Sequence, residues 1–407
     1  MAASLSHLRV LDLSRILAGP WAGQLLADLG AEVIKVERRD VGDDTRAWGP
    51  PFLQDKDNDE TLDAAYFQCA NRNKKSVTID FTCPEGQALV RHLAERSDVV
   101  IENFKVGGLA PYGLDHASLR TLNPRLVYCS ITGFGQTGPY ATRPGYDFLI
   151  QAMGGLMSIT GAGPDEPGTG PQKVGVAVTD ILTGLYATVG ILAALAHRER
   201  TGEGQYIDVA LLDVQVATLA NQAANYLIGG EPPRRMGNAH PNIVPYQDFP
   251  TADGDMIIAV GNDGQFTRLC SSLGCPELST DPHYRNNQSR VQHRLALVDI
   301  LRSYTRRQST SHWISELEAA GVPCGPINTM ADVFTDPQIR ARGMRIELPH
   351  DRAGTVALVA NPLQLSQTPV RYDAAPPALG QHTREVLSSV LGLDSAHIDE
   401  LENKKII

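Results

Sequence analysis

The N-terminal half of the chain alternates short apolar runs with amphipathic segments, and this rhythm constrains the fold more than any other feature. The apolar runs predict strands, and the segments between them predict helices. The expected strands are Leu8–Leu13, Glu32–Glu37, Lys75–Phe81, Asp98–Asn103, Leu126–Phe134 and Gly204–Leu212. Helices are expected from about Pro20, from Pro84 after a Thr82 cap, and over about 114–122, 146–157 and 180–198. This βαβ order predicts an α/β fold with a parallel sheet covered on both faces.

The sequence changes character after about Gly230. The stretch 231–249 is rich in proline and asparagine and predicts a long connection. A smaller α/β region follows to about Gly325, with a strand at Asp255–Gly261 and helices near 265–273, 292–305 and 311–320. The tail shows strand patterns around residues 346 and 356 and a last helix from about 381.

Composition excludes several classes of protein. The 407 residues are 42% hydrophobic, which is typical of a globular chain with a large core. The 36 basic and 46 acidic residues give a net charge of −10, so the chain lacks the electrostatic character of a protein that binds nucleic acid or an anionic membrane. No targeting or membrane-spanning segment is expected, and the apolar stretch Ile181–Ala196 is interpreted as a buried helix.

Six cysteines are present without a CxxC pair, and no histidine cluster has zinc-ligand spacing. They predict reduced, buried thiols of a cytoplasmic protein, and no metal site. There is also no GxGxxG after the first strand, no P-loop, no GxSxG and no HExxH. These absences count against a dehydrogenase, an NTPase, a serine hydrolase and a zincin.

Asp180 stands at the start of a nearly all-apolar helical segment. One interpretation is a helix N-cap, a position at which aspartate is strongly preferred. The other is a carboxylate that the helix dipole keeps ionised at the edge of a dry core, where it can act as a nucleophile.

Three further features have both a structural and a functional interpretation. The string Gly261–Gln265 is either a turn before a helix or a mobile glycine loop that covers a site. The strand-end residues Glu102–Phe104 could help to frame a planar ligand. A set of basic residues near strand ends is either a solvated surface or a phosphate site: Arg38, Arg39, Arg46, Arg72, Lys74 and Lys75.

Several strings together resemble the class III CoA-transferase family, which includes formyl-CoA:oxalate and carnitine CoA-transferases. They include LRVLDLSRILAGP, LADLGAEVIKVERRDVGDDTR, NRNKKSVTIDF, VVIENF, NPRLVYCSITGFGQTGPY, GYDFLIQAMGGLMSITG, KVGVAVTDILTGLYA and HRERTGEGQYIDVALLD, in family order, with GNDGQ, GVPCGPINT and LGQHT as weaker matches farther on. The resemblance implies a Rossmann-like large domain built from both chain ends, here 1–228 and 326–407. It also implies a small central domain, 229–325, and a homodimer whose chains interlock.

The resemblance also implies site residues and a covalent mechanism. Asp180 matches the family nucleophile, which forms an aspartyl anhydride and an aspartyl-CoA thioester. An aspartate of ordinary pKa near 4 would need no general base for this attack. Tyr146 matches a tyrosine beside the thioester, and the loop with Gly261, Gly264 and Gln265 would exclude water. The CoA contacts expected from the resemblance are Leu17 (where the oxalate enzyme has glutamine), Ala18, Arg38, Asn103, Phe104 and Lys105, of which Lys105 could substitute for a phosphate-binding arginine of other members. From the set of basic residues near strand ends, Arg46, Arg72 and Lys75 are expected as further CoA contacts.

Two other functions stay open at this stage. An α-methylacyl-CoA racemase shares the family fold, but racemases carry histidine where this chain has Tyr146, and a tyrosine of ordinary pKa is a poor base at neutral pH. A non-catalytic acyl-CoA-binding protein is the other alternative. The segment 234–249 resembles that of members that use small dicarboxylates, and Arg234, Arg235, Asn238 and His240 could hold a distal carboxylate. We therefore expect succinyl-CoA as donor and a C4–C6 dicarboxylate, such as glutarate or itaconate, as acceptor.

Overall fold

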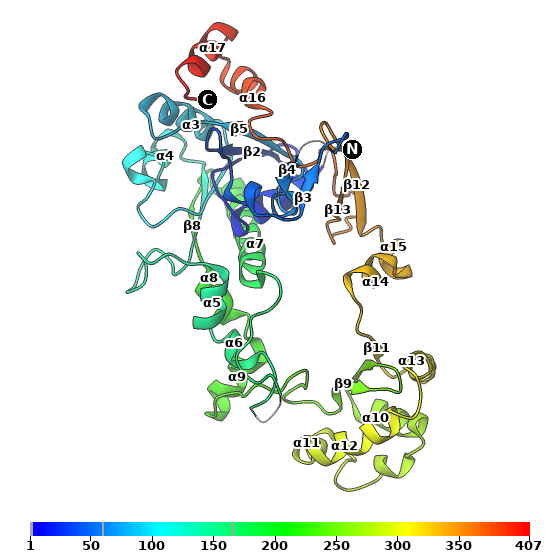
Figure 1. Ribbon diagram of the computed structural model, residues 1–407. Coiled ribbons are helices and arrows are strands. Elements are labelled where there is room, and N and C mark those ends of the chain that lie inside the picture. Colours follow the sequence, from blue (N-terminus) through cyan, green and yellow to red (C-terminus); the bar gives the residue numbers. More distant parts are fainter. Residues whose placement is uncertain (1–2, 59–60, 165–166) are drawn as a thin grey trace. The chain divides into compact units, whose positions relative to one another are not determined.

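A computed structural model describes residues 3–58, 61–164 and 167–407. The chain forms two compact units (Figure 1). Unit 1 comprises residues 1–156, 174–224 and 337–407, and unit 2 comprises 157–173 and 225–336. The expected small domain, 229–325, falls inside unit 2, which also includes 157–173.

Six parallel strands form the central sheet of unit 1. They are β1 (Arg9–Asp12), β2 (Glu32–Glu37), β5 (Lys74–Thr78), β6 (Val99–Glu102), β7 (Val127–Thr132) and β8 (Tyr206–Ala210). All six were predicted, and β2 has the predicted bounds. Their spatial order is β5-β2-β1-β6-β7-β8. Counted along the chain this is 3-2-1-4-5-6, the order of doubly wound dinucleotide-binding sheets, in which the direction of winding reverses between β1 and its neighbour β6.

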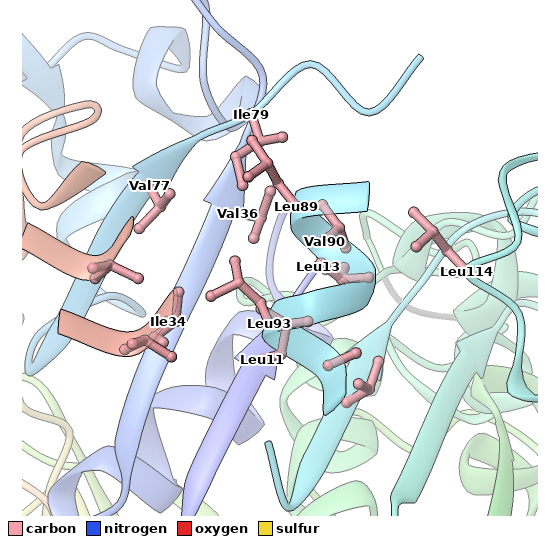
Figure 2. Close-up of a cluster of buried hydrophobic side chains, with 14 of the residues drawn as sticks. Leu11, Leu13, Ile34, Val36, Val77, Ile79, Leu89, Val90, Leu93 and Leu114 are labelled. Carbon is pink, nitrogen blue, oxygen red and sulfur yellow. The ribbon is translucent and has the colours of Figure 1, made fainter. Parts of the chain in front are cut away.

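Helices cover both faces of this sheet, because successive strand residues point to opposite sides. Leu11 and Ile34 join a core under α3 (Pro84–Glu95), α4 (His116–Leu122), α16 (Thr383–Leu391) and α17 (Ser395–Asn403). Figure 2 shows the strand side chains of this core meeting Leu89, Val90 and Leu93 of α3. Their neighbours on the same strands face the other core, formed with α1 (Ala18–Asp28), α5 (Asp147–Met153), α7 (Val178–Thr201) and α8 (Leu211–Ala217).

The C-terminal segment returns to the β5 edge of the sheet, where α16 and α17 lie near α3 and β5 (Figure 1). The amide of Asp80 donates to the carbonyl of Ile406 at 2.7 Å. Smaller elements complete unit 1: η1 (Asp44–Ala47), β3 (Phe52–Gln54), β4 (Thr61–Ala64), α2 (Ala65–Gln68), η2 (Ala110–Tyr112), α15 (Pro337–Ala341), β12 (Arg345–His350) and β13 (Gly354–Val359).

Unit 2 has its own core on an antiparallel sheet of order β11-β10-β9. The strands are β9 (Tyr246–Pro250), β10 (Asp255–Ala259) and β11 (Cys324–Pro326). Between β10 and β11 lie α10 (Asp263–Leu273), η3 (Pro276–Ser279), α11 (Asn287–Gln292), α12 (Arg294–Thr305) and α13 (Thr310–Ala319), and α14 (Met330–Thr335) follows β11. The short α6 (Leu156–Ile159) and α9 (Ala220–Gly229) lie at the boundaries between the two units.

Five local predictions are corrected. Helix α7 begins at Val178, so Asp180 is its third residue and not its N-cap. Cys83, not Thr82, precedes α3. The expected helix over 146–157 is two helices, α5 and α6, and the one over 292–305 is interrupted at His293. Among the thiols, Cys69 is exposed, while Cys129, Cys270 and Cys275 are buried as expected.

Helix α7 is, in the described ranges, the one helix long and apolar enough to span a membrane by those two criteria. It contacts α1, β7 and β8, and Ala187, Ile191 and Ala194 are fully buried in the core that it shares with them. These contacts are those of a core helix of unit 1.

Candidate active site

A cavity of about 810 Å³ opens in unit 1 where β1 and β6 end, at the point where the strand order reverses. Open α/β sheets bind ligands at this edge. The lining comes from the segments that follow the strands: Leu13, Arg15–Ala18, Lys35–Asp43, Ile79–Thr82, Asn103–Val106, Gly108, Tyr112, Ile131–Gly133, Ala141, Arg143–Tyr146, Asp180, Leu211 and Lys405. Eight of the predicted site residues are among them: Leu17, Ala18, Arg38, Asn103, Phe104, Lys105, Tyr146 and Asp180.

The loop between β1 and α1 forms one wall, and its backbone is held in an uncommon conformation. Ile16 has φ +74°, which is costly for a β-branched residue. Its amide donates to both carboxylate oxygens of Asp43 at 3.2 Å. The side-chain amide of Asn103 clamps Arg15 by accepting from its N–H at 2.9 Å and donating to its carbonyl at 2.7 Å. Asn103 therefore shapes the wall of the cavity.

A buried ion pair supports this wall from below. Lys35 Nζ lies 2.9 Å from Asp43 Oδ2, and both side chains are inaccessible to solvent. Burial alone would raise the pKa of Asp43, but the charge of Lys35 and hydrogen bonds from Lys35 and Thr45 outweigh burial and lower it to about 2. The lysine also donates to the carbonyl of Ser14 at 2.8 Å. The pair therefore ties β2 to the loop after β1.

Asp180 lies in the cavity wall, in the first turn of α7. Burial, and secondly the negative charge of Asp147, raise the pKa of Asp180 to about 7. The expectation of an ordinary pKa near 4 is thus corrected, because desolvation outweighs the helix dipole at this position. The carboxylate is half ionised at neutral pH and poorly solvated when ionised.

Apolar and aromatic side chains share the lining of the cavity with this carboxyl group. Tyr146 precedes α5 and is 60% exposed, and Ile131 and Leu211 also line the cavity. Tyr66 of α2 was not expected from the sequence. Burial, and next the charge of Asp180, raise the pKa of Tyr66 to about 12, so the phenol keeps its proton. Trp48 packs edge-on against Tyr66, with ring centroids 5.3 Å apart.

The other part of the cavity combines aromatic rings with cations. Phe104 meets Phe81 edge-to-face at 5.9 Å, and the guanidinium of Arg15 lies 5.3 Å from the centroid of Phe104. Arg38 donates to Asp44 at 2.6 Å and remains half exposed. Lys105 is exposed, and no ion pair of its side chain occurs within the described ranges. This arrangement suits a planar base and an anionic group.

Three predicted CoA contacts do not line the cavity, because their side chains form ion pairs with carboxylates of the protein. Arg46 is buried and bonds Glu37 and Asp63, each at 2.7 Å. Arg72 is buried against Asp28, with Nε donating to Oδ1 at 2.9 Å. Lys75 bridges two glutamates, Glu32 and Glu385, at 2.9 Å each. Lys74, likewise buried, pairs with Asp12 at 2.9 Å. These ion pairs link β1, β2, β5 and α1, and none of the four cations lines the cavity.

The remaining predicted residues lie in unit 2. Gly261 and Gly264 belong to the start of α10, where Asn262 Oδ1 accepts from the amide of Gln265 at 2.9 Å. The side chain of Gln265 in turn accepts from the amide of Gly261 at 2.7 Å. These bonds fit the helix-start interpretation. A covering loop stays a prediction.

The four predicted carboxylate ligands, Arg234, Arg235, Asn238 and His240, also belong to unit 2. His240 Nδ1 accepts from the amide of Asn242 at 3.0 Å, and the imidazole ring lies 5.2 Å from that of Tyr246. Burial and the charge of Arg294 lower the pKa of His240. These contacts brace the connection, whereas Arg234 is exposed.

Sequence reasoning missed part of the lining. Residues Ile79–Thr82 follow β5 and take the place that had been assigned to Arg72 and Lys75. Arg143 stacks over Tyr140, 4.6 Å from the ring centroid, and Lys405 reaches the cavity from the C-terminal segment. The rule that ligands bind beyond strand ends could have found 79–82, but nothing in the sequence signals Lys405.

Comparisons with known proteins agree with this geometry. The family model described as CoA-transferase family III matches residues 5–383. The succinate–glutarate CoA-transferase of Agrobacterium fabrum is 55% identical over 386 residues, which cover 95% of each chain. The succinyl-CoA:glutarate CoA-transferase of Mus musculus is 45% identical over 98% of this chain and 88% of its own. The crystal structure of a CaiB/BaiF family protein from Brucella suis matches with a TM-score of 0.84 and 51% identity, covering 96% of this chain and all of the other. This chain belongs to CoA-transferase family III.

Proposed function

We propose that the protein transfers CoA from succinyl-CoA to a C4–C6 dicarboxylate, with glutarate as the first choice, through covalent intermediates on Asp180. The observation that carries this proposal is the carboxyl group of Asp180 in the wall of the cavity, desolvated enough for its pKa to reach about 7. A poorly solvated carboxylate is a stronger nucleophile than one in water. The fit of the remaining lining to an adenine ring and phosphates supports CoA as the co-substrate.

The chemistry needs no proton donor. A carboxylate oxygen of Asp180 attacks the thioester carbonyl of succinyl-CoA, and the C–S bond breaks to give a mixed anhydride and CoA thiolate. The thiolate then attacks the aspartyl carbonyl, which releases succinate and forms an aspartyl-CoA thioester. The acceptor carboxylate attacks this thioester and expels the thiolate, and the thiolate attacks the acceptor carbonyl of the new anhydride. The products are the new acyl-CoA and the regenerated carboxylate.

The substrate assignment rests on relatives and on unit 2. The similar proteins from Agrobacterium fabrum and mouse are named for succinate or succinyl-CoA and glutarate, and a third, from Chloroflexus aurantiacus, for succinyl-CoA and D-citramalate. We propose Arg234 and His240 of unit 2 as ligands for the distal carboxylate of the acceptor, and the loop 261–265 stays the predicted covering loop. Arg234 is exposed, as such a role requires.

We also propose a cytoplasmic homodimer. Several large apolar side chains of unit 1 are exposed on α5, α7 and α8: Phe148 (58%), Tyr186 (48%), Val189 (64%) and Val216 (51%). Exposed apolar side chains on three contacting helices are expected to be covered by a partner, here a second copy.

The test is an intact mass spectrum after the protein is mixed with succinyl-CoA, with hydroxylamine or borohydride in parallel samples. Wild-type protein is expected to carry an adduct, and the trapping reagents should mark Asp180. The variant D180N keeps the shape of the side chain but should form no adduct and transfer no CoA, while it still binds CoA.

Three outcomes would contradict the proposal in whole or in part. Equal turnover by wild type and D180N would eliminate the covalent mechanism. Absence of an adduct, together with deuterium exchange at the α-carbon of a branched acyl-CoA, would instead indicate a racemase. Transfer to carnitine or an aromatic acid, with succinyl-CoA ignored, would retain the mechanism and refute the substrate.

A further inference from the structure

The first turn of α7 is capped by a carboxylate from another helix. The residue before α7, Ala177, offers no side-chain acceptor. Instead, Asp147 Oδ1 accepts from the amide of Thr179 at 2.8 Å and lies 3.4 Å from the amide nitrogen of Asp180. The first amides of a helix have no partner within it, so this carboxylate satisfies donors that would otherwise be unbonded. It also brings a second negative charge next to Asp180.

Asp147 is itself held on its other side. Its Oδ2 accepts from Gln151 Nε2 at 2.6 Å, and Gln151 is fully buried. The side-chain oxygen Oε1 of Gln151 accepts from the backbone amide of Val174 at 2.9 Å, in the segment that leads into α7. The amide of Gln151 therefore cannot turn over without losing a bond, and Asp147 is fixed between α5 and α7.

A backbone contact sets where α5 begins. Gly133 follows β7, and Gly145 lies two residues before Asp147. A Cβ atom built on Gly145 would stand 2.3 Å from the Cα of Gly133, and one on Gly133 would stand 2.5 Å from the Cα of Gly145. Two chain segments can approach this closely only without side chains. The glycine pair thus fixes the Tyr146–Asp147 segment against the end of β7.

We propose that Asp147 is a positioning residue for the transfer reaction: it orients the first turn of α7 and sets the pH at which Asp180 becomes a nucleophile. This rests on the proposed function, in which Asp180 attacks the thioester. A capping carboxylate far from any ionisable group would only satisfy the helix amides. Next to Asp180, the negative charge of Asp147 also raises the pH at which Asp180 loses its proton.

The surrounding charges support this assignment. Burial and Asp147 are the two causes that raise the pKa of Asp180. Tyr66 of α2 also faces Asp180 but keeps its proton, since burial and that carboxylate raise the pKa of Tyr66 to about 12. The other elements packed against α7 carry carboxylates at Asp28 on α1, which is paired with Arg72, at Asp208 on β8 and at Asp213 on α8.

The experiment compares wild type with D147N and D147S, both of which remove the charge and keep a hydrogen-bond acceptor. The control is D213N, which removes an exposed carboxylate from the neighbouring helix α8. Two quantities are measured against pH: kcat/KM for succinyl-CoA, and the ¹³C shift of the aspartate carboxyl that disappears in D180N. Thermal unfolding checks that each variant folds.

In wild type both midpoints are expected near 7, so kcat/KM at pH 6 is about one-tenth of its plateau. In D147N and D147S both midpoints move to lower pH, yet stay above 3.8, because burial, the larger cause, remains. Relative activity at pH 6 therefore rises even if the plateau falls. D213N keeps the wild-type midpoint.

Unchanged midpoints in the two neutral variants, or the same shift in D213N, would overturn the inference. A lower plateau without a shift would reduce Asp147 to a helix cap and overturn it as well. The carboxyl resonance does not depend on turnover. If it shifts as expected but neither wild type nor any variant transfers CoA, the proposed function fails and the effect of Asp147 on the ionisation of Asp180 stands.

Discussion

The backbone amide of Ile16 and the carboxylate of Asp43 meet at 3.2 Å, and this contact holds a left-handed residue in the wall of the cavity. The same carboxylate neutralises the fully buried ammonium of Lys35. One side chain thus supports both a loop conformation and a buried charge. This makes the stability of the protein depend on Asp43 more than on any exposed acid nearby.

Replacing Asp43 with asparagine is expected to lower the free energy of unfolding by about 3–5 kcal/mol, because the buried ammonium of Lys35 loses the carboxylate that it contacts and keeps only the more distant charges of Asp12 and Glu37. Urea unfolding at neutral pH measures this. Because folding lowers the pKa of Asp43 to about 2, the contribution is present above pH 3.8 and disappears as pH falls towards 2. The matched variant D44N breaks half-exposed pairs with Arg15 and Arg38 and should cost at most about 1 kcal/mol. Equal losses in the two variants would contradict the role of the buried pair.

Asp180, the proposed nucleophile, should itself reduce the stability of the folded protein. Folding raises the pKa of Asp180 to about 7. The resulting loss of stability therefore grows as pH rises from 3.8 to 7 and is constant above that. The free energy of unfolding of D180N is therefore expected to exceed that of wild type by about 2–4 kcal/mol at pH 8 and to differ little from it at pH 4. Urea titrations at the two pH values test this. A gain that is the same at both pH values would show that the carboxyl group is not desolvated.

Arg38 and Arg72 were both expected to bind CoA, and the structure separates them. R72M leaves the fully buried Asp28 without its guanidinium and should destabilise the protein by about 3–5 kcal/mol, with the KM for succinyl-CoA unchanged in the folded fraction. R38M removes a half-exposed guanidinium from the cavity lining and should raise KM about tenfold with little loss of stability. The reverse pattern would return Arg72 to the binding site.

Lys105 is expected to contact a phosphate of CoA. K105M should raise the KM for succinyl-CoA by about 10-fold and weaken its dependence on salt, since a charge-assisted hydrogen bond is lost. K105R should retain most of the affinity. Comparing succinyl-CoA with its 3′-dephospho form identifies the phosphate: if K105M no longer distinguishes the two thioesters, the contact is to the 3′-phosphate. A KM that does not change in K105M would remove this residue from the site.

The sequence was sufficient for the sheet of unit 1. Each strand packs against helices on both faces and is therefore a continuous apolar run. Such a run can be recognised in the sequence without knowing which strands lie next to it. It was also sufficient for Asp180 and for the lining that follows β1, β2 and β6, because ordered family strings run through those positions. Short elements such as β3, α2 and α17 were missed. In these segments the local pattern is weak and the contacts come from distant parts of the chain.

Which cations face the cavity was decided by tertiary structure alone. Arg38, Arg46 and Arg72 are equivalent in the sequence, but the last two meet carboxylates that the folding of the sheet brings beneath them. The state of Asp180 was decided in the same way. Its sequence neighbours predict a capping carboxylate of ordinary pKa, whereas Asp147 arrives from α5 to take the capping role, and the cavity wall removes water. Charge and solvation depend on what surrounds a group in space, and a linear pattern does not contain that information.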